Sequence, residues 1–277
     1  MVGIMSHPTN SDPNSIVPIT TTPENLDVVL ETERKAREAK MTREVIFVAG
    51  AGERLDSSMM AYRLCRRFLK TTDKVTFLQY NNSIGPVNRT PNPADFTGSL
   101  TASRISGRVA LVNYIRQTSF VPIIVGYSLG AYVVSDFLEF MAKGQYPGLQ
   151  VGKVLTIGNP RAAKRKSTNV VGIAGAHGKW PSNVQTYELS NYMDLISSVT
   201  DGSMLMSLPG IVDVMTGRIF DDVDDFAAWW NEITKNVRAA PTFRDIDLIN
   251  RYRNQSGHVN DYFYDRVLNS YPSQVFV

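Results

Sequence analysis

The pentapeptide Gly-Tyr-Ser-Leu-Gly at residues 126–130 constrains this chain more than any other feature. An apolar run with β-branched residues, Phe120–Val125, precedes it and is typical of a buried strand. Residues Ala131–Met141 follow it, with apolar side chains at helical spacing. Glycines on both sides of a serine remove side chains that would collide across a sharp turn. The pattern therefore predicts a strand, a strained turn at Ser128 and a helix.

A Gly-x-Ser-x-Gly turn between a strand and a helix is the nucleophile elbow of α/β-hydrolases, where it exposes the serine hydroxyl. We therefore predict that Ser128 is an esterase-type nucleophile. The alternative is a tight strand-to-helix turn without chemistry, because so short a string also occurs by chance.

Composition narrows the other possibilities. The chain has 277 residues, of which 43% are hydrophobic and 20% charged, so we expect a substantial core and little disorder. A formal net charge of +3 is too small to predict nucleic-acid binding. The single cysteine, Cys65, lies in a helical pattern and cannot form an intrachain disulfide, which favours a packed core thiol and folding in a reducing cytoplasm.

Targeting and membrane signals are weak in this sequence. The N-terminus lacks the basic and apolar regions of a signal peptide. No apolar stretch approaches the roughly 20 residues of a membrane span. We therefore expect synthesis in the cytoplasm without a signal peptide, and no integral membrane insertion.

Apolar strands alternate with helices from residue 44 onward. Strands are expected at 45–49, 74–80, 120–125, 151–157 and 184–189, and helices at 56–69, 100–116 and 131–141. Such alternation predicts a parallel sheet covered by helices on both faces. Together with the Ser128 motif, it predicts an α/β-hydrolase: a three-layer α/β sandwich with a mostly parallel central sheet.

Two further regions lie outside this alternation. Residues 1–43 read as a polar tail followed by a charged helix from Thr22 to Lys40, ahead of a hydrolase domain at 44–277. Residues from about 197 to 256 read as a helical insertion over the carboxyl edge of the sheet, rich in methionine and carrying Trp229 and Trp230. Its apolar side chains either form a lid that binds acyl chains or simply attach the insertion to the sheet.

A nucleophilic serine needs a histidine base. In α/β-hydrolases the acid and then the histidine follow the serine along the chain. His258 precedes a helical pattern near the end of the chain, so we predict that it is the base. His7 and His177 both precede the last expected strand and cannot follow the acid.

The acid is expected just after the strand at 184–189. Asp194 is the first carboxylate on that loop, so we predict that it orients the base. Asp201 and Asp213 are the alternatives. A later acidic run is expected to be the solvated start of a helix; it comprises Asp221, Asp222, Asp224 and Asp225.

Two backbone N–H groups are needed to bind the negative charge that develops during acyl transfer. Leu129, directly after the nucleophile, is expected to supply one. The loop after the first strand, Gly50–Glu53, is expected to supply the other from Ala51 or Gly52, because small residues let the substrate approach. Ala51 is the preferred donor, and no metal or cofactor is expected.

The chain resembles the cutinase-like serine esterases, and within them the lysin B proteins of phages that infect mycolic-acid-bearing actinobacteria. The resemblance covers roughly residues 44–270. The residues that carry it are Ala49–Glu53, Gly126–Gly130, Gly158-Asn159-Pro160-Arg161, Asp194 and His258. It implies a cutinase-like core with a helical linker before the histidine. It also implies cleavage of the ester joining mycolic acids to arabinogalactan, which detaches the host outer membrane late in infection.

This resemblance implies a lipid-ester or mycolyl-polysaccharide substrate, with the protein acting at the envelope after release or carried in the virion. The N-terminal 43 residues are too short for a peptidoglycan-binding module. The alternatives are a general lipase, cutinase or thioesterase, or a virion-associated envelope-binding protein on a hydrolase scaffold. A basic run either contacts a polyanionic surface or is a solvated loop; it comprises Arg161, Lys164, Arg165 and Lys166.

Overall fold

A five-stranded parallel sheet organises the unit Thr42–Val277. The strands follow the spatial order β2-β1-β3-β4-β6, and all four neighbouring pairs are parallel. Their bounds are β1 (Arg43–Val48), β2 (Asp73–Phe77), β3 (Ile123–Tyr127), β4 (Lys153–Ile157) and β6 (Gln185–Leu189). The central strands are apolar and buried along almost their whole length, as expected for strands covered on both faces.

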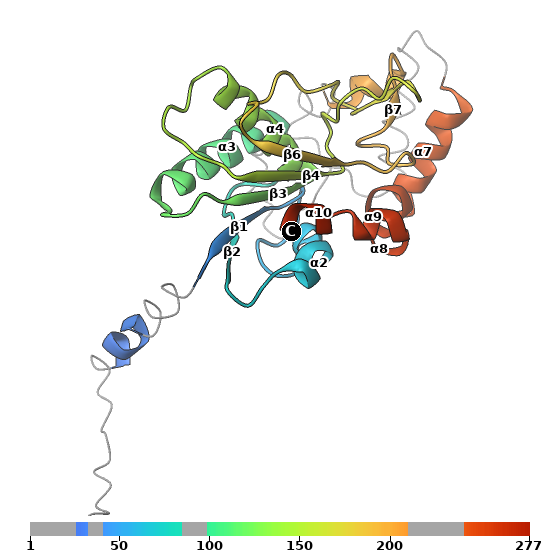
Figure 1. The fold of residues 1–277 in the computed structure, drawn as a ribbon. Coiled ribbons are helices and arrows are strands. Elements are labelled where there is room, and N and C mark those ends of the chain that lie inside the picture. The colour runs from blue at the N-terminus through green and yellow to red at the C-terminus, as the bar shows by residue number, and fades with distance from the viewer. Residues whose placement is uncertain (1–25, 33–40, 85–98, 210–240) are drawn as a thin grey trace, which may run out of the picture. The chain divides into compact units, whose positions relative to one another are not determined.

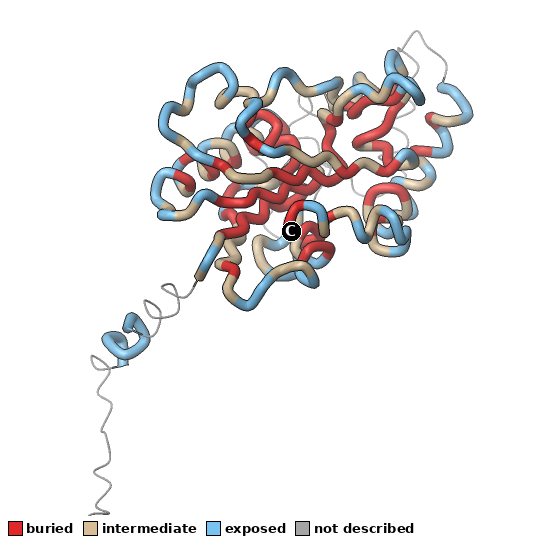
Figure 2. The backbone as a smooth tube through the Cα atoms, viewed as in Figure 1, coloured by how far each residue is buried: buried red, intermediate tan, exposed pale blue. Residues whose placement is uncertain are grey.

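Helices cover both faces of this sheet (Figure 1). The pair α3 (Leu100–Gln117) and α4 (Leu129–Ala142) lies on one face, whereas α2 (Met60–Cys65) and α10 (Ser273–Phe276) lie on the other. The buried residues follow the sheet and the inner sides of these helices (Figure 2). The three-layer α/β fold expected from the sequence is confirmed.

Several element boundaries differ from expectation. β3 begins at Ile123 and extends through Tyr127, because its pairing with β4 continues as far as Tyr127. The helix expected at 56–69 is shorter: α2 begins at Met60 and passes into a 3₁₀ turn, η1 (Arg66–Phe68). The Glu53 carboxylate accepts the Met60 N–H at 2.7 Å, which caps the chain where α2 begins.

A second, smaller apolar cluster lies beside the main core. The sequence did not indicate its antiparallel pair of two-residue strands, β5 (Val170–Val171) and β7 (Val199–Thr200). The cluster also takes residues from η3 (Met204–Ser207) and α7 (Phe243–Arg253), and comprises Val171, Ile173, Leu195, Val199, Leu205 and Leu248. In the described part of the expected insertion, Val199, Leu205 and Leu248 therefore pack against residues outside the insertion, which attaches it to the rest of the domain.

The structure is a computed structural model that describes residues 26–32, 41–84, 99–209 and 241–277. In the other unit, Met1–Met41, residues 26–32 are helical, within the helix expected there. His7, Asp213, Trp229, Trp230 and the acidic run at 221–225 lie outside the described residues. Within the described ranges, no helix combines the length and the apolar character needed to cross a membrane.

Candidate active site

Ser128 occupies a strained turn between β3 and α4. Its φ of 52° and ψ of −116° are uncommon for a residue with a side chain, and its N–H donates to the Ile157 carbonyl at 2.9 Å. A Cβ at Gly126 would lie 2.7 Å from the Gly130 carbonyl oxygen, and one at Gly130 would lie 2.1 Å from the Val48 oxygen. Gly126 therefore lets the turn fold back against the start of α4, and Gly130 lets the start of α4 pack against β1.

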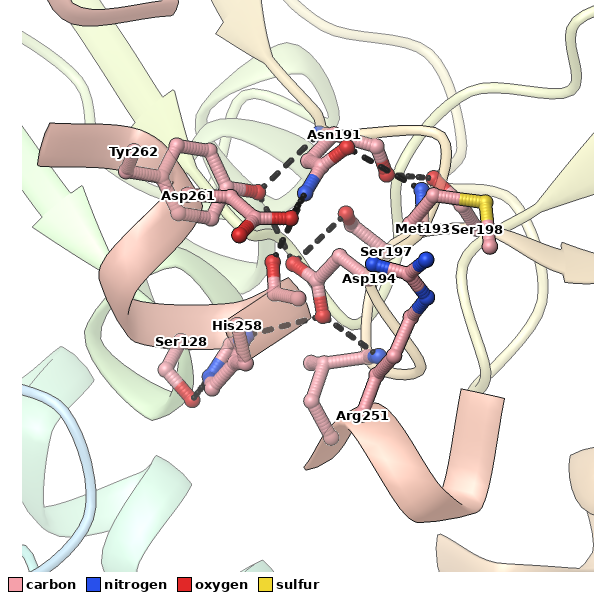
Figure 3. A network of polar contacts seen from close by, with 12 residues as sticks. Ser128, Asn191, Met193, Asp194, Ser197, Ser198, Arg251, His258, Asp261 and Tyr262 are labelled. Atoms are coloured by element: carbon pink, nitrogen blue, oxygen red, sulfur yellow. Dashed lines mark hydrogen bonds and ion pairs between the residues drawn. The ribbon is translucent and has the colours of Figure 1, made fainter. Parts of the chain in front are cut away.

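His258 lies between Ser128 and Asp194 (Figure 3). Its Nε2 is 2.9 Å from the Ser128 Oγ, and its Nδ1 is 2.9 Å from the Asp194 Oδ1. Both distances are hydrogen-bond distances, although the three residues lie far apart in the chain. His258 lies in a π-helical turn, η4 (Ser256–Asn260), directly before the helix α8 (Asp261–Tyr264). Such turns are frequent at functional sites.

The Asp194 carboxylate is fully buried and has donors on both oxygens. Besides His258, the Ile196 N–H donates to Oδ1 at 2.8 Å. The Ser197 hydroxyl and the Tyr262 hydroxyl donate to Oδ2 at 2.9 and 2.8 Å. A buried charge is tolerated only when it is paired and hydrogen-bonded in this way. The alternative acid Asp201 instead pairs with Lys164 at 2.5 Å, away from this network.

Two tyrosines hold the histidine and the aspartate in position. The Tyr127 ring stacks on the His258 imidazole with centroids 5.0 Å apart, and its hydroxyl donates to the His258 carbonyl at 2.9 Å. Tyr262 also accepts the Asn191 N–H at 3.1 Å, so it links the acid loop to the helix after the histidine. Burial raises the pKa of both phenols well above the ordinary value, so both remain protonated donors.

The turn that follows β4 leaves room for the histidine and the aspartate. Gly158 has a φ of +56°, and a Cβ there would lie 3.0 Å from the His258 Cε1 and 3.1 Å from the Asp194 Oδ2. Beside it, the buried Asn159 amide donates to the Ser135 hydroxyl on α4 at 2.9 Å. Arg161 forms an ion pair with Glu139 on α4 at 3.0 Å. The turn at residues 158–161 therefore joins the end of β4 to α4.

The basic run after this turn is engaged within the protein. Arg161 is paired with α4, and Lys164 with Asp201. Arg165 donates to the Ser198 hydroxyl and to the Ser190 carbonyl. Of the four cations considered as a polyanion contact, only the exposed Lys166 makes no such pairing with the residues described here.

The loop after β1 presents one free backbone donor. The Gly50 N–H donates to the Glu53 Oε2 at 2.5 Å, and the Gly52 N–H donates to the Asn82 carbonyl at 3.0 Å. The Asn82 amide in turn donates to the carbonyls of Gly50 and Glu53, both at 2.8 Å. The Ala51 N–H has no acceptor among the described residues. Burial raises the pKa of Glu53 even though two N–H groups bind its carboxylate.

Leu129 provides a second free donor next to this loop. As the first residue of α4, its N–H has no acceptor one turn earlier in the helix. The close approach of Gly130 to the Val48 and Ala49 carbonyls brings the start of α4 against the end of β1, from which the Ala51 loop continues. Both expected oxyanion donors are therefore unpaired and lie on adjacent elements.

The other described histidine and cysteine are outside this network. His177 stacks on Trp180 at 3.7 Å and its Nε2 lies 3.4 Å from the Glu188 carboxylate. Cys65 is fully buried. Among the described residues, no group of three or more His, Cys, Asp or Glu side chains is arranged to hold a metal ion.

No protein-family model matches the chain, and no curated protein matches it in sequence. Solved structures with a similar fold include lysin B from Mycobacteriophage D29, at 15% identity and a TM-score of 0.46, covering 82% of this chain and 91% of that one. A cutinase-like protein from Cryptococcus sp. has 16% identity and a TM-score of 0.39, with coverages of 64% and 93%. The catalytic core domain of acetyl xylan esterase from Trichoderma reesei has 13% identity and a TM-score of 0.42, with coverages of 64% and 96%. These likenesses concern the fold alone.

Proposed function

We propose that the chain is a metal-independent serine esterase. The observation that carries this proposal is the continuous hydrogen-bonded series from Ser128 Oγ through both nitrogens of His258 to Asp194. A serine on a strained turn, an imidazole within reach and a buried carboxylate behind it are the parts that acyl transfer requires. Two unpaired N–H groups beside the serine supply the site for the oxyanion.

In the first half-reaction, the Ser128 Oγ attacks the ester carbonyl carbon while the His258 Nε2 takes the hydroxyl proton. Asp194 holds the Nδ1–H and stabilises the imidazolium that forms. The Leu129 and Ala51 N–H groups bind the oxyanion of the tetrahedral intermediate. The intermediate then collapses, and His258 gives its proton to the departing alkoxide, which leaves an acyl-enzyme. Water then attacks that acyl group through the same base and frees Ser128.

Turnover of p-nitrophenyl butyrate tests this mechanism. Ser128→Ala removes the nucleophile and should abolish nearly all hydrolysis, with an unchanged circular dichroism spectrum as evidence of folding. Asp194→Asn should cost on the order of 10⁴-fold in kcat, because it leaves the imidazole in the wrong tautomer. A Ser128→Ala protein that hydrolyses the ester at the wild-type rate would refute the mechanism.

For the substrate, we propose lipid esters of the actinobacterial envelope, and specifically the ester between mycolic acid and arabinogalactan, cleaved during phage-induced lysis. The support is the resemblance of Ala49–Glu53, Gly126–Gly130, Gly158–Arg161, Asp194 and His258 to lysin B proteins. Purified mycolyl-arabinogalactan, triglyceride and acyl-CoA should be compared as substrates. Release of mycolic acid in preference to the other two products supports the proposal; preference for triglyceride or acyl-CoA indicates a lipase or a thioesterase instead.

A further inference from the structure

A stripe of positive charge runs along α2 and η1. Arg63, Arg66 and Arg67 recur at intervals of three and four residues and therefore project from one side of this helical segment. Leu64 and Cys65, between them, are buried and attach the opposite side to the core. All three arginines are exposed, and none forms an ion pair with a carboxylate in the part of the chain that the structure describes.

The end of the chain lies directly beside this stripe. The Arg63 guanidinium lies 5.0 Å from the centre of the Phe263 ring, next to the end of α8. The Arg67 side chain donates to the Asn269 carbonyl in α9 (Arg266–Ser270) at 2.7 Å. The two arginines are four residues apart in the chain, and their partners, Phe263 and Asn269, are six residues apart. Together the two contacts hold α9 alongside α2 and η1.

Two apolar side chains project from this part of α8 and α9 into solvent. Tyr264 is 84% exposed and Val267 is 73% exposed. Arg266 is exposed between them. The intervening acid, Asp265, is occupied as a helix cap, since its carboxylate accepts the Val267 and Leu268 N–H groups at 2.8 and 3.0 Å. Asp265 keeps its negative charge, but the four exposed arginines around it, Arg63, Arg66, Arg67 and Arg266, leave the local charge positive.

We propose that this region, the α2–α9 surface, docks on a lipid bilayer that carries anionic headgroups. It consists of Arg63, Arg66, Arg67, Tyr264, Arg266 and Val267. The arginines match the negative potential of such a bilayer, and tyrosine is favoured at the boundary between headgroups and acyl chains. Val267 gains free energy only where it leaves water, which a soluble polyanion does not offer. The combination therefore fits a membrane surface better than a nucleic acid or a charged polysaccharide.

The elements that carry the α2–α9 surface are linked to both halves of the candidate active site. The Met60 N–H at the start of α2 is bound by Glu53, which also binds the Ala51 loop through the Gly50 N–H. α8 begins directly after the turn that carries His258. This inference goes beyond esterase activity, because co-sedimentation measures docking and not hydrolysis, and the Ser128→Ala protein, which lacks the nucleophile, should dock as the wild type does.

Co-sedimentation of the full chain with vesicles tests the proposal. The protein should bind vesicles of equal parts phosphatidylglycerol and phosphatidylcholine, and should bind pure phosphatidylcholine far more weakly. The double variant Arg66→Gln/Arg266→Gln removes two cations that make no internal contact among the described residues. It should weaken binding about 25-fold, since each cation near an anionic leaflet contributes about fivefold. Val267→Ser should also weaken binding.

The matched control is Arg116→Gln/Lys166→Gln, which removes the same charge from two exposed positions on other elements. This control should bind the anionic vesicles within about twofold of the wild type. Equal losses in the two double variants would overturn the proposal, because they would indicate a general effect of net charge. Binding to dextran sulfate but not to vesicles would overturn it in favour of a polyanion. Turnover of p-nitrophenyl butyrate reports on the proposed catalysis separately, and should be unchanged in every variant.

Discussion

Replacement of Glu53 by glutamine tests whether the Ala51 loop is held in place for catalysis. The carboxylate accepts two backbone N–H groups, from Gly50 at 2.5 Å and from Met60 at 2.7 Å. Glutamine keeps one oxygen, and its NH₂ group then faces one of these donors. One charge-assisted bond is lost, which is about 1.5–3 kcal/mol. Asn82 still holds the loop from its other side, so the loop is loosened and not released.

The expected result is a fall in kcat of about 10- to 100-fold with KM changed little, because the oxyanion contact strengthens in the transition state. Complete removal of an oxyanion donor costs about 10²- to 10³-fold, which sets the upper limit. Steady-state hydrolysis of p-nitrophenyl butyrate measures both constants. If folded Glu53→Gln protein keeps kcat within twofold, or loses activity only through KM, the assigned role of the loop is wrong.

Glu44→Gln is the matched control, since Glu44 is buried at the opposite end of β1. Burial acts to raise the pKa of Glu44, but hydrogen bonds from Thr118, Tyr114 and Thr76 outweigh it and the pKa is lowered. A lowered folded-state pKa contributes stability above the unfolded value of about 4.5 that is lost as the pH falls through the folded value. Glu44→Gln should therefore lower the unfolding free energy at pH 7 and leave kcat unchanged.

Three other predictions follow from single side chains. Tyr262→Phe removes a hydrogen-bond donor to the buried Asp194 carboxylate. It should lower kcat, and it should lower the unfolding free energy measured by urea titration by about 3 kcal/mol. A variant as stable as the wild type would contradict the packing described. Gly158→Ala places a residue with a side chain in a left-handed backbone conformation and puts its Cβ 3.0 Å from the His258 imidazole. The kcat should therefore fall at least about tenfold. Unchanged turnover would show that the imidazole is not confined there. Burial acts to lower the pKa of His177, but hydrogen bonds to Glu188 and to the Gly178 carbonyl raise that pKa overall. The raised pKa means that His177 contributes stability below about pH 6.5, and that this contribution is lost as the pH rises through the folded-state pKa. The difference in unfolding free energy between wild type and His177→Gln should therefore shrink from about pH 5.5 to pH 9, and a constant difference would exclude the effect.

The parallel sheet and the Ser128 turn could be predicted because local sequence determines them. Strands such as Val45–Ala49 are continuous apolar runs, and the two glycines at 126 and 130 have a steric role that any such turn requires. His258 and Asp194 followed from chain order and from the ends of expected elements. Their convergence with Ser128 at hydrogen-bond distance is a property of the fold that no local pattern contains.

Other features depend on contacts between distant segments and could not be predicted in this way. Tyr127 and Tyr262 look like ordinary core aromatics in the sequence, although Tyr127 lies inside the serine motif and Tyr262 lies one helical turn after His258. The two-residue strands β5 and β7 are too short to show a period. The sequence offers only a polyanion contact or a solvated loop for Arg161, because its partner, Glu139, comes from the distant helix α4.

Labelling with a fluorophosphonate, followed by peptide mapping, tests the central claim most directly, because the reagent reacts only with an activated serine. The wild type should carry a single adduct, on Ser128. His258→Ala should react far more slowly, since the hydroxyl then has no base within 2.9 Å. An unlabelled wild-type protein, a label on another serine, or undiminished labelling of His258→Ala would contradict a Ser128 nucleophile activated by His258.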